Sequence, residues 1–180
     1  MRYRLLKDIG LCLAVVFLFI MWYKNVMERN RRYEVPKKYY YMGETLIYDD
    51  WSIIPFSRSE IMDGNTFKNA FDVKNVSVSM ESKYMCLTLK VEKLSENCNM
   101  DTFLEAGFRS DTWSNGIDPF LFYDINSENL SKIEEEGKGI LYIPVDFFPD
   151  NWKKNRYRNL EQENFRYVIS VYPVTIEIVL

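Results

Sequence analysis

The sequence predicts a mainly β protein in which an N-terminal transmembrane helix precedes an antiparallel β-sandwich. Three observations predict this fold class. Residues 9–23 form the longest stretch without a charged side chain. Seven or eight later segments alternate apolar and polar residues with a period of two, which is typical of half-buried strands. Aromatic residues make up 16% of the 180 residues, and aromatic side chains favour strands.

The N-terminal segment has the pattern of a membrane anchor. Residues 1–8 are basic and predict a cytoplasmic N-terminus. We expect a transmembrane helix over residues 9–27. Extended back to Leu5, this helix is about 34 Å long and spans a hydrocarbon core of roughly 30 Å. The residues that we expect at the two membrane surfaces are Lys7, Trp22, Tyr23 and Lys24.

The sequence bears on both the cleavage of this segment and its orientation in the membrane. No small-x-small pattern follows the apolar run, so an uncleaved span is favoured over a cleaved export signal or a buried helix. The basic N-terminus favours a domain outside the cytoplasm. Six basic residues that follow the span, within residues 24–38, favour a cytoplasmic domain. We favour the extracytoplasmic orientation, because long translocated domains often escape the charge rule, and keep the cytoplasmic-facing one as the alternative.

The remainder divides into a connecting segment and one domain. Residues 28–43 are predicted to form a juxtamembrane stalk, in which Pro36 ends any helix. The tyrosines at positions 39–41 either lie on the membrane surface or begin the first strand of the domain. Residues 44–180 are predicted to form the β-sandwich domain.

Within the domain, alternation marks the strands. The clearest strand covers residues 83–94, where Met85, Leu87 and Leu89 face one way and Cys86 lies on the less apolar side. The other predicted strands lie within residues 46–56, 73–80, 102–108, 118–125, 139–147, 164–172 and 174–180. Short helices are predicted within residues 57–71, 126–137 and 150–164.

Composition excludes several function classes. The chain has no histidine, which excludes histidine as a general base or a metal ligand. The net charge of −3 argues against nucleic acid as the main partner. No P-loop, Rossmann turn or zinc ligand set is found, so we expect no catalytic residues, no cofactor and no metal site. Cys86 and Cys98 could form a disulfide in an oxidising compartment, and the alternative is two partly buried thiols.

Two tryptophan-containing loops are candidate binding sites. Trp113 and Asn115 lie in the polar loop of residues 109–120, where an exposed tryptophan could bind a sugar ring or a partner protein. The alternative is that Trp113 folds back over the end of the sandwich. Trp152 lies beside a basic cluster that could contact anionic headgroups or cell-wall polymers. This cluster comprises Lys153, Lys154, Arg156 and Arg158.

The layout resembles a group of bacterial membrane-anchored proteins of unknown function that carry one immunoglobulin-like domain after a short span and a stalk. The segments that carry the resemblance are the anchor, "MGETLIYDDWSIIPFSRSEI" at residues 42–61 and "FRYVISVYPVTIEIVL" at residues 165–180. The resemblance implies an immunoglobulin-like sandwich outside the cytoplasm. It assigns no functional residue.

The predicted function is a non-enzymatic binding or interaction module at the cell envelope. Residues 9–27 would anchor it in the lipid bilayer, and its partner would be a protein or a cell-wall component. One alternative is an envelope polysaccharide hydrolase that uses two carboxylates. Another is an accessory or immunity subunit of an integral membrane complex, which would act mainly through its helix.

Overall fold

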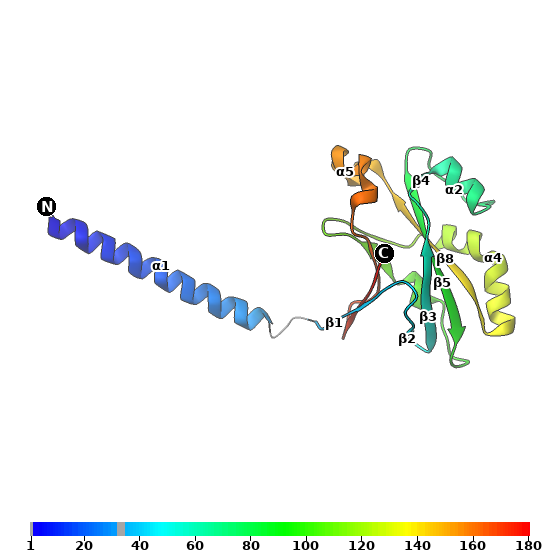
Figure 1. Ribbon diagram of the computed structural model, residues 1–180, viewed down its shortest axis with the longest axis horizontal. Helices are drawn as coiled ribbons and strands as arrows, with labels where there is room; N and C mark the ends of the chain where they lie inside the picture. The colour runs from blue at the N-terminus through cyan, green and yellow to red at the C-terminus, as the bar shows by residue number, and fades with distance from the viewer. Residues whose placement is uncertain (1, 32–34) are drawn as a thin grey trace. The chain divides into compact units, whose positions relative to one another are not determined.

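The protein consists of two compact units, Met1–Pro36 and Lys37–Leu180 (Figure 1). The computed structural model describes the backbone of residues 2–31 and 35–180, and the side chains of residues 15–29 and 35–180. The first unit contains one helix, α1 (Arg2–Arg31). The second unit contains all the strands of the described chain.

Helix α1 is apolar on every side over part of its length. Each of the nine consecutive residues 15–23 is at least 50% exposed, and all nine are large and hydrophobic. In the part of α1 whose side chains are described, no segment is long and apolar enough to cross a membrane. The predicted span, residues 9–27, also includes residues 9–14, whose side chains lie outside the described ones, as does that of Lys7.

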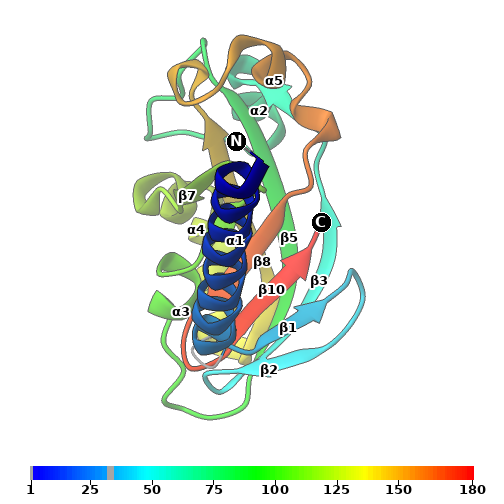
Figure 2. The same cartoon turned by 90° about the vertical axis from the view of Figure 1, so that its left-hand side faces the viewer.

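The domain is a β-sandwich of two five-stranded sheets. Sheet A has the strand order β1 (Lys37–Tyr40), β10 (Thr175–Val179), β9 (Arg166–Ser170), β6 (Gly107–Arg109) and β7 (Ser114–Gly116). Sheet B contains β2 (Leu46–Tyr48), β3 (Trp51–Arg58), β4 (Met62–Asp63), β5 (Lys83–Lys93) and β8 (Lys138–Phe147). Figure 2 shows β1 and β10 side by side, and α5 at the end of the domain opposite β2.

The main core lies between the two sheets, and alternation along β5 shows how the sequence builds it. Met85, Leu87 and Leu89 are fully buried in this core, as predicted. Cys86 points to the other face of sheet B and joins a second cluster there. Each apolar side chain of this size that is fully buried stabilises the fold by about 1.5–3 kcal/mol.

Two helices cover the second cluster on the outer face of sheet B (Figure 1). Phe67 of α2 (Gly64–Ala70) and Leu121 of α4 (Pro119–Glu136) pack there with Tyr84 and Cys86 of β5. Two shorter α-helices and two 3₁₀ turns lie in connections: α3 (Asp101–Leu104), α5 (Lys154–Arg158), and η1 (Pro149–Asn151) and η2 (Leu160–Gln162), which flank α5. The fold is therefore a sandwich with a helical layer on one side.

Three predicted strands are corrected. Residues 118–125 begin α4, because the Asp118 carboxylate accepts hydrogen bonds from the backbone N–H groups of Phe120 and Leu121 and Pro119 occupies the first helical turn. Residues 102–108 divide between α3 and β6. Residues 73–80 form no strand; their valines at positions 73 and 78 are buried because they pack over sheet B in the second cluster.

The start of the domain also differs from our prediction. The domain begins at Lys37 and not at residue 44, because β1 pairs with β10. Tyr39 and Tyr40 therefore belong to the first strand. The β1–β10 pair is parallel, whereas all the other strand pairs in the described part of the chain are antiparallel. The β-sandwich is confirmed; its immunoglobulin-like form is not.

Candidate functional site

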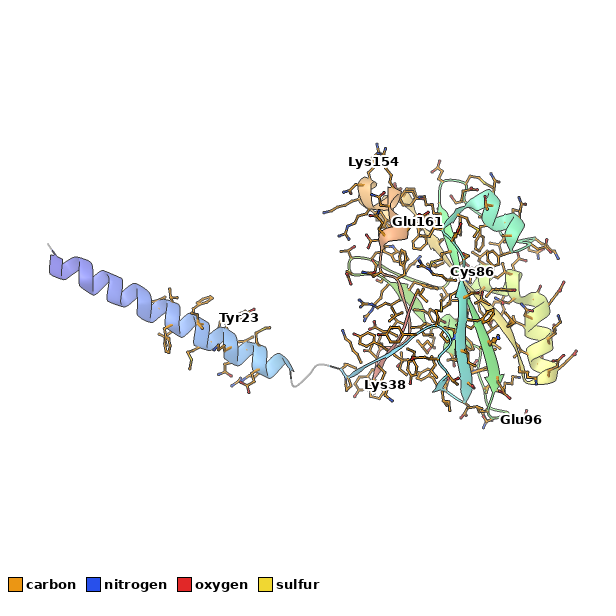
Figure 3. All side chains as sticks on the ribbon, viewed as in Figure 1. Tyr23, Lys38, Cys86, Glu96, Lys154 and Glu161 are labelled. Carbon is orange, nitrogen blue, oxygen red and sulfur yellow. The ribbon has the colours of Figure 1, made fainter. Side chains whose placement is uncertain are left out.

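The segment that follows β8 builds a surface hollow at one end of the domain. In Figure 3, Lys154 and Glu161 mark this segment, at the end of the domain opposite Glu96. The hollow has a volume of about 350 Å³. We call it the α5 hollow, and the residues that line it are Thr112, Asn151, Trp152, Lys153 and Arg156.

Helix α5 is held against sheet B by one tyrosine. The Tyr157 hydroxyl donates a hydrogen bond to the backbone oxygen of Glu81 at 2.9 Å, and the Lys83 ammonium donates to the backbone oxygen of Tyr157 at 3.3 Å. Burial raises the pKa of the Tyr157 phenol, so the hydroxyl stays protonated and able to donate at neutral pH. These bonds fix one wall of the α5 hollow relative to β5.

A cluster of aromatic side chains packs against Trp152, one of the residues that line the α5 hollow. The ring centroid of Trp113 lies 5.1 Å from those of both Phe147 and Trp152, and 6.1 Å from that of Phe165. Trp113 is only 9% exposed and belongs to the main core. The predicted contact role of Trp113 is therefore replaced by the alternative, a tryptophan folded over the end of the sandwich. Trp152 is half-buried and lines the hollow.

The polar groups that line the α5 hollow are mostly hydrogen-bond donors. The Arg156 guanidinium donates to the Thr112 hydroxyl, and its Nη1 lies 3.8 Å from Oε1 of Glu163. Lys153 is exposed, and among the described residues its ammonium forms no ion pair. Glu163 is not in the lining, which contains no carboxylate. The site therefore offers two cations on one wall.

Two tryptophan N–H groups at this end are unsatisfied. Within residues 35–180, Nε1 of Trp113 and Nε1 of Trp152 are buried without a hydrogen-bond partner. A buried donor without a partner costs about 1–3 kcal/mol. Trp152 therefore lines the α5 hollow, and its buried indole N–H has no hydrogen-bond partner among the described residues.

Asn115 lies apart from Trp152, so the structure does not bring the three predicted contact residues into one site. Its Nδ2 donates to Oδ1 of Asp146 at 2.8 Å, which links β7 of sheet A to β8 of sheet B. Desolvation raises the pKa of the Asp146 carboxyl, and the nearby Asp118 charge raises it further. Asn115 borders a different hollow of about 450 Å³, which also contains Gly107, Gly116, Arg109 and Val168.

Sequence reasoning missed a buried ionic group on sheet A. Glu177 of β10 is 0% exposed, and its carboxylate is paired with the guanidinium groups of Arg109 and Arg166. We call these three residues the Glu177 cluster. Among the described residues, the carboxylate has no well-aligned hydrogen bond, so the two positive charges compensate for its burial. Alternation marks Glu177 only as the polar position between Ile176 and Ile178.

The two cysteines of the domain are both free. The Cys86 thiol is fully buried under the helical layer, and burial raises its pKa. The Cys98 thiol donates to the backbone oxygen of Asp50 at 2.9 Å and packs against the main core. Because the two side chains lie on opposite faces of sheet B, the disulfide that the sequence allowed does not form.

The hydrolase alternative requires a cleft with two carboxylates. Four hollows on the described domain bear on this requirement. Their volumes are about 450, 330, 240 and 350 Å³, and each of the first three contains one glutamate, while the α5 hollow contains none. None of these four hollows therefore holds the pair of acids that the alternative needs.

Comparison with known proteins gives a family but no activity. The family model described as "Domain of unknown function (DUF5028)" matches residues 37–176. No curated protein matches the sequence significantly. A solved structure of an uncharacterized beta-sandwich protein from Clostridium difficile 630 is 11% identical, with a TM-score of 0.45, and the alignment covers 82% of this chain and 96% of that one. Since the family model matches more than half of the chain, the protein belongs to the DUF5028 family of domains of unknown function.

Proposed function

We propose that the protein is a membrane-anchored, non-enzymatic binding module that holds its β-sandwich domain outside the cytoplasm. Residues 9–27 are the anchor, and the α5 hollow is the contact site for a partner at the cell envelope. The partner is a protein or a cell-wall component.

One observation carries the anchoring part of this proposal: the run of nine exposed hydrophobic side chains at residues 15–23. A helix that is hydrophobic all round is stable only inside a large core or a lipid bilayer. Within the helix unit Met1–Pro36, α1 is the only described secondary-structure element, so this unit offers it no core. The bilayer is the surrounding that we assign to it.

The binding part rests on the α5 hollow. Its volume lies within the range of about 300–1,000 Å³ that ligand sites occupy. Trp152 supplies a half-buried aromatic wall, and Lys153 and Arg156 supply charge. A rigid scaffold that presents such groups on connecting segments is the usual arrangement of a binding domain.

Alkaline washing of membranes tests the anchor. The full-length chain is expected to stay in the membrane pellet. The double variant Val16→Arg/Phe19→Arg is expected to move to the supernatant, because each arginine near the middle of a span costs about 2.5–3.5 kcal/mol. The control Glu28→Arg, outside residues 9–27, should stay in the pellet. Recovery of the unaltered chain in the supernatant would contradict the anchor.

Cysteine labelling of intact cells tests the side of the membrane. In a Cys12→Ser background, a membrane-impermeant maleimide is expected to label the domain at Cys98, because Cys86 is fully buried. The Cys98→Ser variant is the control and should lose the label. Labelling that occurs only after the cells are opened would assign the domain to the cytoplasmic side.

Co-sedimentation with purified cell walls and envelope proteins tests the contact site. The full-length protein in mild detergent should sediment with its partner fraction, and Trp152→Ala should reduce the bound fraction several-fold. Phe120→Ala is the control, because Phe120 is 76% exposed and lies outside the α5 hollow. Equal loss in both variants, or in neither, would remove the α5 hollow as the contact site.

A further inference from the structure

We propose that the α5 hollow binds the phosphate group of a phosphate ester. This inference rests on the proposed function and deepens it, since it names the chemical class that the contact site recognises. It goes beyond the family comparison, which assigns no ligand.

The chemistry of the lining favours an acceptor-rich anion. Lys153 and Arg156 contribute two cationic side chains, and Asn151 adds an amide. Trp152 contributes its ring to the wall and not its indole N–H, which is buried. A phosphate group presents several strong acceptor oxygens and so can use more of these donors than a carboxylate can.

The dimensions favour an ester rather than free phosphate. A volume of about 350 Å³ exceeds what one phosphate group fills. The additional space is bordered by Trp152, whose ring is supported by Trp113 and Phe147 at centroid separations of 5.1 and 6.1 Å. An aromatic wall that is held in place in this way suits the alcohol or sugar part of the ester.

Glu163 competes with a bound phosphate group for the Arg156 guanidinium. Its side chain is 16% exposed and lies 3.8 Å from the Arg156 guanidinium, which is 42% exposed. A contact of this length leaves the guanidinium free to form shorter bonds with a bound anion. Removal of the Glu163 charge should therefore strengthen phosphate binding, an effect that a purely structural Arg156 would not produce.

Phosphate esters reach this part of the cell from two sources, phospholipid headgroups and phosphate-containing wall polymers. Within the domain, the α5 hollow lies at the end remote from Lys38 in β1, where the chain enters the sandwich (Figure 3). The shared chemistry is the phosphate ester, and the experiment separates the sources.

The test uses the full chain in nanodiscs of phosphatidylcholine, titrated with glycerol 3-phosphate and followed by calorimetry and tryptophan fluorescence. Lys153→Gln/Arg156→Gln should weaken binding by at least about tenfold, since charge-assisted hydrogen bonds to phosphate are lost. The matched control is Lys154→Gln/Arg158→Gln, which removes the same charge from exposed residues of α5 outside the lining. It should change affinity less than about twofold, as surface charges screened by salt do.

Two further variants keep the result interpretable. Lys153→Gln alone breaks no ion pair among the described residues, so we expect it to lose affinity without losing thermal stability. Glu163→Gln should raise affinity by about threefold, because one competing charge near the site is removed. Thermal melting of each variant accompanies the titration.

The outcomes separate the two proposals. Absence of glycerol 3-phosphate binding, or equal losses in the lining and control variants, overturns the phosphate assignment, while envelope binding that depends on Trp152 would still support the proposed function. Replacement of some phosphatidylcholine by phosphatidylglycerol distinguishes the sources. A drop in apparent affinity for glycerol 3-phosphate would identify the lipid headgroup, and unchanged affinity would identify a wall polymer or soluble ester.

Discussion

The Glu177 cluster and the α5 hollow each contain two cationic side chains, but only in the first are both cations paired with a carboxylate. Arg109 and Arg166 share one fully buried carboxylate on sheet A. Lys153 and Arg156 border a hollow whose nearest anion, Glu163, lies 3.8 Å from Arg156. The contrast distinguishes charge that maintains the fold from charge that remains available to a ligand.

The largest expected effect is on the Glu177 cluster. Arg109→Met/Arg166→Met leaves the Glu177 carboxylate buried without compensation, which should lower the free energy of unfolding by about 3 kcal/mol, the lower end of the range for such charges. The arginines are each 30% exposed, which is why we take the lower end. Urea unfolding followed by circular dichroism measures this. The control is Arg58→Met/Arg158→Met, at two exposed positions. If the Arg109→Met/Arg166→Met variant loses no more unfolding free energy than this control, the Glu177 cluster does not stabilise the fold.

The second largest effect is the difference in stability cost between replacing Trp113 and replacing Trp152. Trp113→Ala removes a core side chain and should cost about 3 kcal/mol of unfolding free energy. Trp152→Ala removes a half-buried wall and should cost roughly half of that, because its exposed part loses no burial. Thermal melting of both variants checks the difference, and equal costs would mean that the wall of the hollow is itself core.

A smaller, pH-dependent effect is expected at Asp146, a carboxyl partnered by the Asn115 amide and not by a cation. Its folded-state pKa is raised above 3.8, the ordinary value for an aspartate, mainly by desolvation, so ionisation at neutral pH opposes folding. Asp146→Asn should therefore raise the melting temperature at pH 7. The gain should shrink as pH falls below the folded pKa and vanish below 3.8, where both states of the native protein are protonated. A gain that is independent of pH would contradict this account.

The smallest effect on stability should come from the α5 hollow itself. Lys153→Gln/Arg156→Gln should change the unfolding free energy by less than about 1 kcal/mol, as exposed ion pairs do. The same variants lose ligand affinity if the phosphate assignment is right. A large loss of stability would place these cations with the Glu177 cluster as structural charge and weaken the comparison.

Alternation in the sequence was sufficient to predict the central strands. Residues 83–93 and 138–147 are long, regular and buried on a consistent face, so local pattern and tertiary structure agree. Residues 118–125 have a short apolar run that fits a strand or a helix equally well. The Asp118–Pro119 pair is a sequence signal for the start of a helix. The Asp118 side chain caps α4, so the segment is helical.

Other features depend on contacts that a single sequence does not display. Val73 and Val78 are buried because they pack across sheet B, and the segment forms no strand although Val76, Val78 and Met80 alternate with polar residues. Of the predicted contact residues, Trp152 lines a hollow, while Trp113 is core and Asn115 bonds to Asp146. Burial of Glu177 requires Arg109 and Arg166 from two other strands, which only the register of sheet A brings together.

The parallel pairing of β1 with β10 has a consequence for the order of assembly. Among the strands of the domain, β1 leaves the ribosome first and β10 last, and each is the other's neighbour in sheet A. A nascent chain therefore cannot close this sheet until synthesis of the domain has finished.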